Sequence, residues 1–323
     1  MKKINNLIII LLLLFVTSQI FYRSEDIVFS ISYSFDLWTN NIFPSLFPVF
    51  IISELLINYG FVELTSELFK PFMNKVFKCG KYSSFVFIMS IISGIPSNAK
   101  YINTLYKEKL INDSEATKIL MFTHFSNPLF ILSTVSIIFL NNKEVGLLIL
   151  CSHYITNLII GIIFRNYSKT SEKYERINIK KSINKCYLKS CKSKPLGYVL
   201  QISLINTINT LLLILGIITF FLMLTTIIDK NLNLDVYTQS ILNGILEMTQ
   251  GLKYISILQV PLKIKAILST FIISFGGISA HCQVMSILSE TNIKYFPYFI
   301  SRILHAIISS FIVFLLFDFN YWY

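Results

Sequence analysis

Small polar side chains gather where the apolar segments of this chain are interrupted. Four such interruptions occur, at 93–100 and 123–128 in the first half and at 247–251 and 274–279 in the second. Lipid cannot satisfy the N–H and C=O groups of an unwound helix, so such a break persists where it lines a cavity or binds something. This predicts reversible hydrogen bonding to a small molecule, and broken segments at matching places of two halves are typical of a secondary transporter.

The candidate residues occupy these interruptions and the positions beside them. Glycine and proline open or disrupt helices, whereas hydroxyl, amide and charged side chains supply contacts to a ligand. For each polar residue the alternative is that it satisfies only freed backbone groups. The candidate substrate-binding residues are Ser97, Asn98, Lys100, Ser126, Asn127, Glu247, Thr249, Gln250, Ser279 and Gln283, and the helix-breaking residues are Gly94, Pro96, Pro128, Gly251, Gly276 and Gly277.

Two of these candidates are charged. Lys100 follows the first hairpin tip and is the natural partner of a carboxylate, or else a lysine that reaches to the membrane interface. Glu247 lies in an apolar segment, where a charge costs at least about 2.5–3.5 kcal/mol on insertion scales, so it is expected to face a cavity. Proton coupling through Glu247 and a structural pair with Lys253 are both open, and we favour the pair.

The remaining ionisable groups predict no enzyme. His124 and His281 lie at or beside the breaks and are expected to be hydrogen-bonded interior residues, with proton coupling as the alternative. Arg302 is expected to reach the membrane edge. The sequence contains no Ser/His/Asp or Cys/His arrangement, no phosphate-binding glycine loop and no metal-ligand spacing, so we expect neither a cofactor nor a metal.

The composition is that of a membrane protein. Apolar residues make up 54% of the chain and charged residues 14%, against roughly a quarter charged in soluble domains. Much of the net charge of +11 lies between Arg165 and Lys194. Because this stretch joins two hydrophobic halves, the positive-inside rule predicts a cytoplasmic loop near anionic lipid headgroups, and not a nucleic-acid site.

The apolar segments predict an all-α polytopic membrane protein with seven transmembrane helices and two re-entrant hairpins. With the N-terminus in the cytoplasm, the two halves have opposite directions throughout, which is an inverted-topology repeat. The first helix is expected to be retained, with a cleaved signal peptide as the alternative. The spans are expected at 6–22, 36–58, 116–140, 145–164, 201–228, 261–288 and 297–317, and the hairpins near 83–95 and 240–252.

This layout divides the chain into four parts. Residues 1–35 hold an N-terminal transmembrane helix and an outer loop, and 36–164 form the first repeat. Residues 165–200 are the basic cytoplasmic linker, and 201–323 form the second repeat. Gly94 precedes Ser126 by the same number of residues as Glu247 precedes Ser279, as expected of a duplicated unit.

Five motifs in order resemble a known family over nearly all of 41–317. They resemble the sporulation integral membrane proteins of endospore-forming bacteria that carry gate, or nucleoside-recognition, domains. Concentrative nucleoside transporters and the membrane part of ferrous-iron transporters belong to the same superfamily. The motifs are NIFPSLFP at 41–48, SGIPSNAK at 93–100, SNPLF at 126–130, GILEMTQG at 244–251 and FGGISAHCQ at 275–283.

The resemblance implies a transporter and a cargo. The most similar branch is implied to move dipicolinate, a planar aromatic dicarboxylate, from the mother cell toward the forespore across the outer forespore membrane. The implied partners are therefore this small anion and the lipid bilayer, without nucleic acid, and a homo-oligomer is left open. Two alternatives remain: a gate-domain transporter of a nucleoside or other metabolite, and a structural membrane protein of spore assembly that transports nothing.

Overall fold

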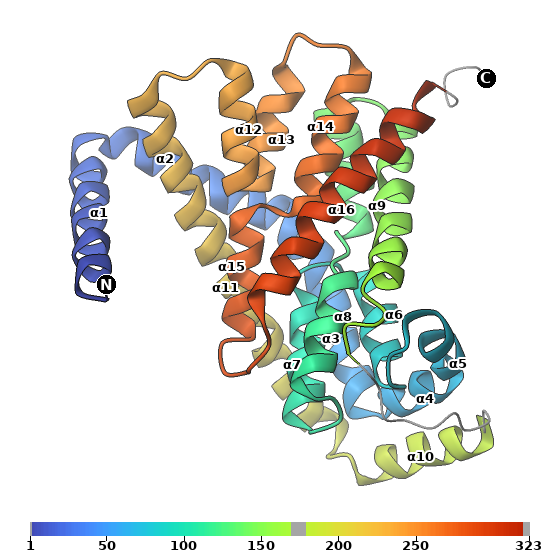
Figure 1. Cartoon of the computed structure of the whole chain (residues 1–323). Helices are drawn as coiled ribbons and strands as arrows, with labels where there is room; N and C mark the ends of the chain where they lie inside the picture. The colour runs from blue at the N-terminus through green and yellow to red at the C-terminus, as the bar shows by residue number, and fades with distance from the viewer. Residues whose placement is uncertain (1, 169–178, 319–323) are drawn as a thin grey trace.

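The computed structural model describes residues 2–168 and 179–318, and within them every regular element is helical. Figure 1 shows the arrangement of the helices. The first half contains three π-helical segments, η1, η2 and η3, among its α-helices. Its elements are α1 Lys2–Tyr22, α2 Ser24–Leu37, η1 Trp38–Ile42, α3 Phe43–Asn58, α4 Phe61–Leu68, α5 Lys70–Phe72, η2 Met73–Phe77, α6 Ser83–Ser93, α7 Ser97–Lys107, α8 Asp113–Phe122, η3 Phe130–Phe139 and α9 Lys143–Ile163.

The second half is α-helical throughout its described part and contains the longest helix, α11. The predicted basic linker contains a helix, α10, and its residues 169–178 lie outside the described part of the chain. The elements are α10 Ile179–Lys192, α11 Leu196–Leu232, α12 Val236–Leu246, α13 Met248–Ile257, α14 Leu262–Phe275, α15 Gly277–Ile287 and α16 Tyr295–Leu316.

Helix length and composition confirm a polytopic, all-α membrane protein in the described residues. Five helical segments are long and apolar enough to cross a bilayer, and they begin at Ser24, Lys143, Leu196, Leu262 and Tyr295. The apolar side chains of α1 are more than half exposed from Leu7 to Leu14, as a helix that faces lipid requires. The segment expected as one span at 116–140 is divided into α8 and η3.

Residues 24–35, expected to belong to an outer loop, lie in helix α2 instead. The buried residues of α2 recur at helical spacing, at Ile27, Ser30, Ser34 and Leu37, and α2 packs against α11. The Ser34 hydroxyl lies 2.8 Å from that of Thr219 on α11. Polar residues between the apolar ones concealed this helix in the sequence.

Two helical hairpins approach the middle of the molecule from opposite ends. In Figure 1, α12 and α13 descend from the top, whereas α7 and the neighbouring α4, α5 and α10 lie at the bottom. The first hairpin, α6 and α7, turns at Gly94, and the second, α12 and α13, turns at Glu247. Each hairpin packs against the broken helix that follows it in the sequence, α8 or α14.

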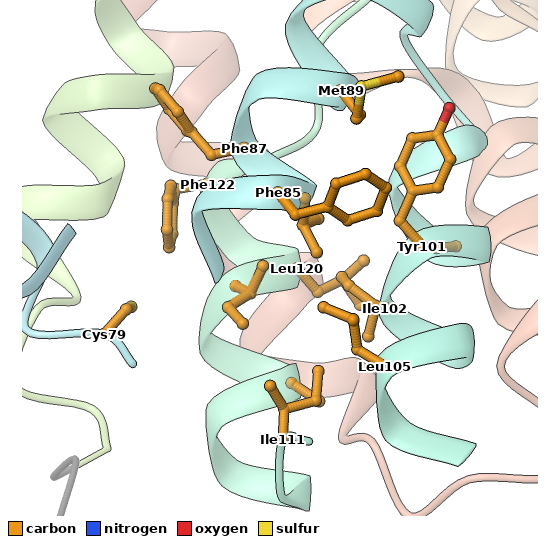
Figure 2. Close-up of a cluster of buried hydrophobic side chains, with 14 of the residues drawn as sticks. Cys79, Phe85, Phe87, Met89, Tyr101, Ile102, Leu105, Ile111, Leu120 and Phe122 are labelled. Atoms are coloured by element: carbon orange, nitrogen blue, oxygen red, sulfur yellow. The ribbon is translucent and has the colours of Figure 1, made fainter. Parts of the chain in front are cut away.

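Two apolar cores fix the hairpins in place. The larger core lies among α6, α7 and α8, where Figure 2 shows interdigitating aromatic and aliphatic side chains. The rings of Phe85 and Tyr101 meet at 5.4 Å, edge to face, an arrangement that adds about 0.5–1.5 kcal/mol to simple burial. The smaller core joins α13 and α14 to η3 through Leu252, Ile273 and Ile131. Because Val284 of α15 belongs to the larger core and Ile131 of η3 to the smaller one, each half inserts part of its broken helix into the other half.

Candidate functional site

The tip of the first hairpin is bonded directly to the first helix break. The N–H of Ile95 donates to the carbonyl of Phe125 at 2.8 Å, and the Asn127 amide donates to the carbonyl of Ser93 at 3.2 Å. Gly94 has a positive φ of 75°, and a Cβ atom there would lie 2.8 Å from the Cα of Asn127. Only glycine therefore allows this approach of two chain segments.

Asn127 also starts the helical segment after the break. Its Oδ1 accepts hydrogen bonds from the N–H groups of Leu129, at 2.8 Å, and Phe130, at 3.4 Å. This is the capping geometry that satisfies the free donors of a helix N-terminus. The side chain thus spans the hairpin tip and the break while remaining at the cavity wall.

The second hairpin meets the second break through Glu247. This carboxylate accepts hydrogen bonds from the Thr249 hydroxyl and from the N–H of Gln250, at 2.9 Å, and its Oε1 lies 3.5 Å from the Ser279 hydroxyl. The expected pair of Glu247 with Lys253 is wrong. The ammonium of Lys253 lies over the ring of Tyr33, 4.1 Å from its centroid.

A cavity of about 60 Å³ lies where the two tips and the two breaks converge, which is room for a few water molecules. One wall comes from each hairpin, and α3, η3, α11 and α15 complete it. Its lining is mostly apolar, and the predicted residues in it are Pro96, Ser126, Asn127, Glu247, Thr249, Ser279 and Gln283. Residues that the sequence did not indicate also line it: Ile42, Ser45, Leu46, Ile95, Phe130, Ile214, Ile218, Met248 and Ala280.

Four predicted binding residues lie outside this lining. Ser97 and Asn98 are buried behind the first tip, and their side-chain polar atoms have no hydrogen-bond partner among the described residues. The ammonium of Lys100 is 2.9 Å from the Glu54 carboxylate on α3. Gln250 lines a separate cavity of about 270 Å³ between α2, α11 and α13.

The ionisable group of the central cavity is acidic. Glu247 is the one ionisable residue among its lining residues, since Lys100 is directed to Glu54. Backbone and hydroxyl donors satisfy Glu247 without a cation. The cavity therefore offers amide and hydroxyl groups, one carboxylate and apolar walls, a set suited to binding rather than to covalent chemistry. No group of His, Cys, Asp and Glu within 2–168 and 179–318 is arranged to hold a metal ion.

Beside this cavity lies a buried cluster that the sequence did not reveal, composed of His124, His153, His281, His305 and Arg302. Arg302 was expected at the membrane edge, which is wrong, because its side chain is fully buried. Its guanidinium donates to the carbonyl of Met121 and to His305 Nδ1, the latter at 2.9 Å. The available signal was the spacing of polar residues along α16, at Tyr298, Arg302 and His305.

Fold and cavity together define a multi-pass helical membrane protein with a polar site between broken helices. The Gate family, described as nucleoside recognition, matches residues 40–143. The sporulation integral membrane protein YlbJ of Bacillus subtilis (strain 168) is 33% identical over 341 aligned residues, which cover 98% of this chain and 84% of the relative. No solved structure matches the chain. The chain belongs to the family of sporulation integral membrane proteins with a gate domain, which confirms the resemblance noted from its motifs.

Proposed function

We propose that this chain is a membrane transporter that moves a small molecule by alternating access around the central cavity. The observation that carries the proposal is the convergence of both hairpin tips and both helix breaks on one cavity. Irregular backbone at membrane depth is tolerated where it lines a cavity, and transporters place their substrate sites at such breaks. Rocking of one half against the other would expose the cavity to each side in turn.

The helix boundaries favour an inverted repeat of the two halves. α6 begins at Ser83 and α12 at Val236, an offset of 153 residues, and α8 and α14 end at Phe122 and Phe275 with the same offset. In this proposal α2 to α9 and α11 to α16 are the two repeats, and α1 is an additional span. The hairpins enter the membrane from opposite faces without crossing it.

The proposed orientation places α10 and the N-terminus in the cytoplasm. The basic residues near α10 support it through the positive-inside rule. For a sporulation protein the proposed location is the outer forespore membrane, with transport from the mother cell toward the forespore.

The proposed cargo is dipicolinate. A flat aromatic diacid would find an apolar slot beside Phe130 and hydrogen-bond donors at Asn127 and Gln283. Glu247 opposes a dianion, because two carboxylates in contact favour taking up a proton between them. We therefore expect the cargo, or Glu247, to be protonated during binding.

The absence of Lys and Arg from the cavity lining favours a second candidate, a neutral cargo such as a nucleoside. A neutral molecule with N–H or O–H groups could donate to Glu247 without a proton. The third alternative, a structural membrane protein, leaves the shared cavity without a role.

Dipicolinate measured separately in mother cell and forespore tests the proposal. A sporulating strain without this chain is rescued with the wild type, with Asn127→Ala or with Gln283→Ala, and Ser133→Ala is the control because it alters an exposed hydroxyl on η3. We expect dipicolinate to stay in the mother cell unless the wild type or the control is present. Normal forespore dipicolinate without the chain would exclude this cargo, and rescue by both cavity variants would exclude this site.

A further inference from the structure

The four histidines of the chain are brought together at the interface between the two halves, although they are distant in sequence. His124 belongs to the first break, His153 to α9, His281 to α15 and His305 to α16. His153 and His305 occupy nearly equivalent positions, ten residues after the start of α9 and of α16, and their ring centroids are 4.5 Å apart. None of these residues lines the central cavity, so the transport site alone does not account for them.

Hydrogen bonds fix the protonation of His153 in this structure. Its Nε2 lies 3.0 Å from the backbone nitrogen of Ser126, which is a donor, so Nε2 must be an unprotonated acceptor. Its Nδ1 lies 2.9 Å from the Ser274 hydroxyl and carries the proton of the neutral ring. His153 thereby holds both breaks, Ser126 in the first and Ser274 in the second.

Arg302 holds His305 in the neutral form as well. A guanidinium can only donate, so His305 Nδ1 accepts from it, and His305 Nε2 donates to the carbonyl of His153 at 2.9 Å. No Asp or Glu of the described chain forms a hydrogen bond or ion pair with Arg302 or with any of the four histidines. A second positive charge on His153 would thus lie near Arg302 without compensation, and no acidic residue would share it.

We propose that His153 is the proton-binding site that couples protonation to movement of the first helix break. A proton that binds to Nε2 converts this atom from acceptor to donor. The N–H of Ser126 then faces another N–H, so the bond that holds Ser126 and the neighbouring Asn127 against α9 is lost. A proton on His153 Nε2 is therefore incompatible with the arrangement of the first break in this structure.

The consequence for equilibrium follows from linkage. A proton that binds only the rearranged state shifts the population toward that state as the pH falls. Arg302 and His305 on α16, His124 in the first break and Tyr154 on α9 surround His153 and set the pH at which the shift occurs. This inference rests on the proposed transport, because it assigns the coupling ion of that cycle.

Hydrogen exchange at the Ser126 amide reads out this coupling directly. The protein is reconstituted in lipid nanodiscs, and the exchange rate of a peptide covering 123–127, divided by the intrinsic rate at the same pH, is compared between about pH 8 and about pH 5, a range that spans histidine titration. We expect protection of Ser126 in the wild type to fall about tenfold for each pH unit below the pKa that His153 has in the rearranged state. A peptide covering α12 supplies the internal reference.

Two substitutions remove the titration and keep a polar side chain. In His153→Gln the amide oxygen still accepts from Ser126, so protection should stay high and independent of pH, and His153→Asn serves if the first variant does not fold. His281→Gln is the matched control, since His281 is bonded to Tyr295 and to the Phe275 carbonyl and not to Ser126. It should retain the pH dependence of the wild type.

Either of two results overturns the proposal: protection of Ser126 in the wild type that does not change with pH, or an unchanged pH dependence in His153→Gln. Uptake into proteoliposomes separates this failure from failure of the proposed function. Uptake with a wild-type pH profile in His153→Gln would reject the proton site and leave the transporter. A pH-dependent break in a protein that moves no cargo would do the reverse.

Discussion

Gly94 allows Asn127 to approach the hairpin tip because glycine has no side chain. Its φ of 75° and the close approach of Asn127 place a single hydrogen atom where other residues carry Cβ. Asn127 in turn bonds both the hairpin tip and the next helical segment. Individual residues of this kind determine the shape of the cavity.

Gly94→Ala should destabilise the protein by roughly 1–3 kcal/mol, because it combines a left-handed backbone conformation with a steric conflict. Thermal unfolding of the detergent-purified protein measures the effect. Gly216→Ala is the matched control, since a Cβ atom there meets nothing within 4 Å and alanine favours the helix. Equal melting temperatures for the two variants would contradict the structure at Gly94.

Glu247→Gln should separate a dianionic cargo from a neutral one. The amide keeps an oxygen to accept from Gln250 N but removes the charge from the cavity. Uptake of dipicolinate at neutral pH should be maintained or rise, whereas binding of a neutral donor such as a nucleoside should weaken about tenfold or more through loss of a charged acceptor. Loss of dipicolinate uptake in a correctly folded variant would argue against the dianion as the bound form.

The Lys100–Glu54 pair, at 2.9 Å between α7 and α3, should be a coupled unit. Lys100→Gln leaves the buried Glu54 without its cation and should cost roughly 2–4 kcal/mol, whereas Lys100→Gln with Glu54→Gln should cost less than the sum of the single changes. A double-mutant cycle of thermal stability measures this coupling energy. Strict additivity would show that the two groups act independently.

The polar breaks could be predicted from the sequence because Pro, Gly and Asn are conspicuous inside apolar segments. Such local signals do not, however, sort the ten predicted binding residues into the six that line the cavity and the four that do not. Lys100 illustrates the reason. Its partner Glu54 lies in another helix, and the sequence contains no information on which face of α7 meets α3.

Among the secondary-structure elements, α16 stabilises the broken end of α8. The last turn of α8 and the residues after it expose carbonyls at Met121 and His124, and the guanidinium of Arg302 lies against both. A cation at a helix C-terminus also interacts favourably with the helix dipole. Asn157 of α9 donates to the His124 carbonyl from another direction, at 3.0 Å.

Arg302→Gln should therefore loosen the first break and lower stability by roughly 2 kcal/mol or more, since buried carbonyls would lose their donor. Arg165→Gln is the control, because Arg165 donates to the Lys75 carbonyl at an exposed site. Thermal unfolding and hydrogen exchange over 121–127 measure both effects. Unchanged exchange in Arg302→Gln would mean that Asn157 alone is sufficient.

Elements were predicted well where a long apolar pattern marks the helix, and poorly where contacts with distant segments determine whether a helix forms. Helices α9, α11, α14 and α16 overlap the predicted spans because their apolar runs are long. Helix α2 was missed because its stabilisation comes from α11, far along the chain. The burial of Arg302 was missed for the same reason: its partners belong to α8 and the break.

At the level of the whole molecule, the two ends of the helix bundle should face different compartments. The loop between α15 and α16 contains Glu290, which pairs with Lys107 of α7 at 2.8 Å, whereas the start of α12 lies at the opposite end (Figure 1). This arrangement follows from the helix order and gives the molecule two distinct faces.

Glu290→Cys and Tyr237→Cys are each introduced into a variant that lacks the native cysteines. The two new thiols should react with a membrane-impermeant maleimide from opposite sides of the membrane. Both positions are exposed, so accessibility within the protein is not limiting. Labelling of intact cells and of inverted vesicles measures the sides. Reaction of both cysteines from one side would exclude the proposed inverted arrangement.

The π-helical segment η3 introduces a difference between the two otherwise similar halves. It follows the first break directly, its first residue Phe130 lines the cavity, and its counterpart α15 is an ordinary α-helix. Because a π-turn closes over one more residue than an α-turn, η3 contains spare chain length. Tightening η3 to an α-helix would release that length toward the cavity and rotate Phe130, while Asn142 keeps the start of α9 fixed. Within its described residues the second half contains no π-helical segment, so under the proposed repeat the motion of the two halves need not be symmetrical.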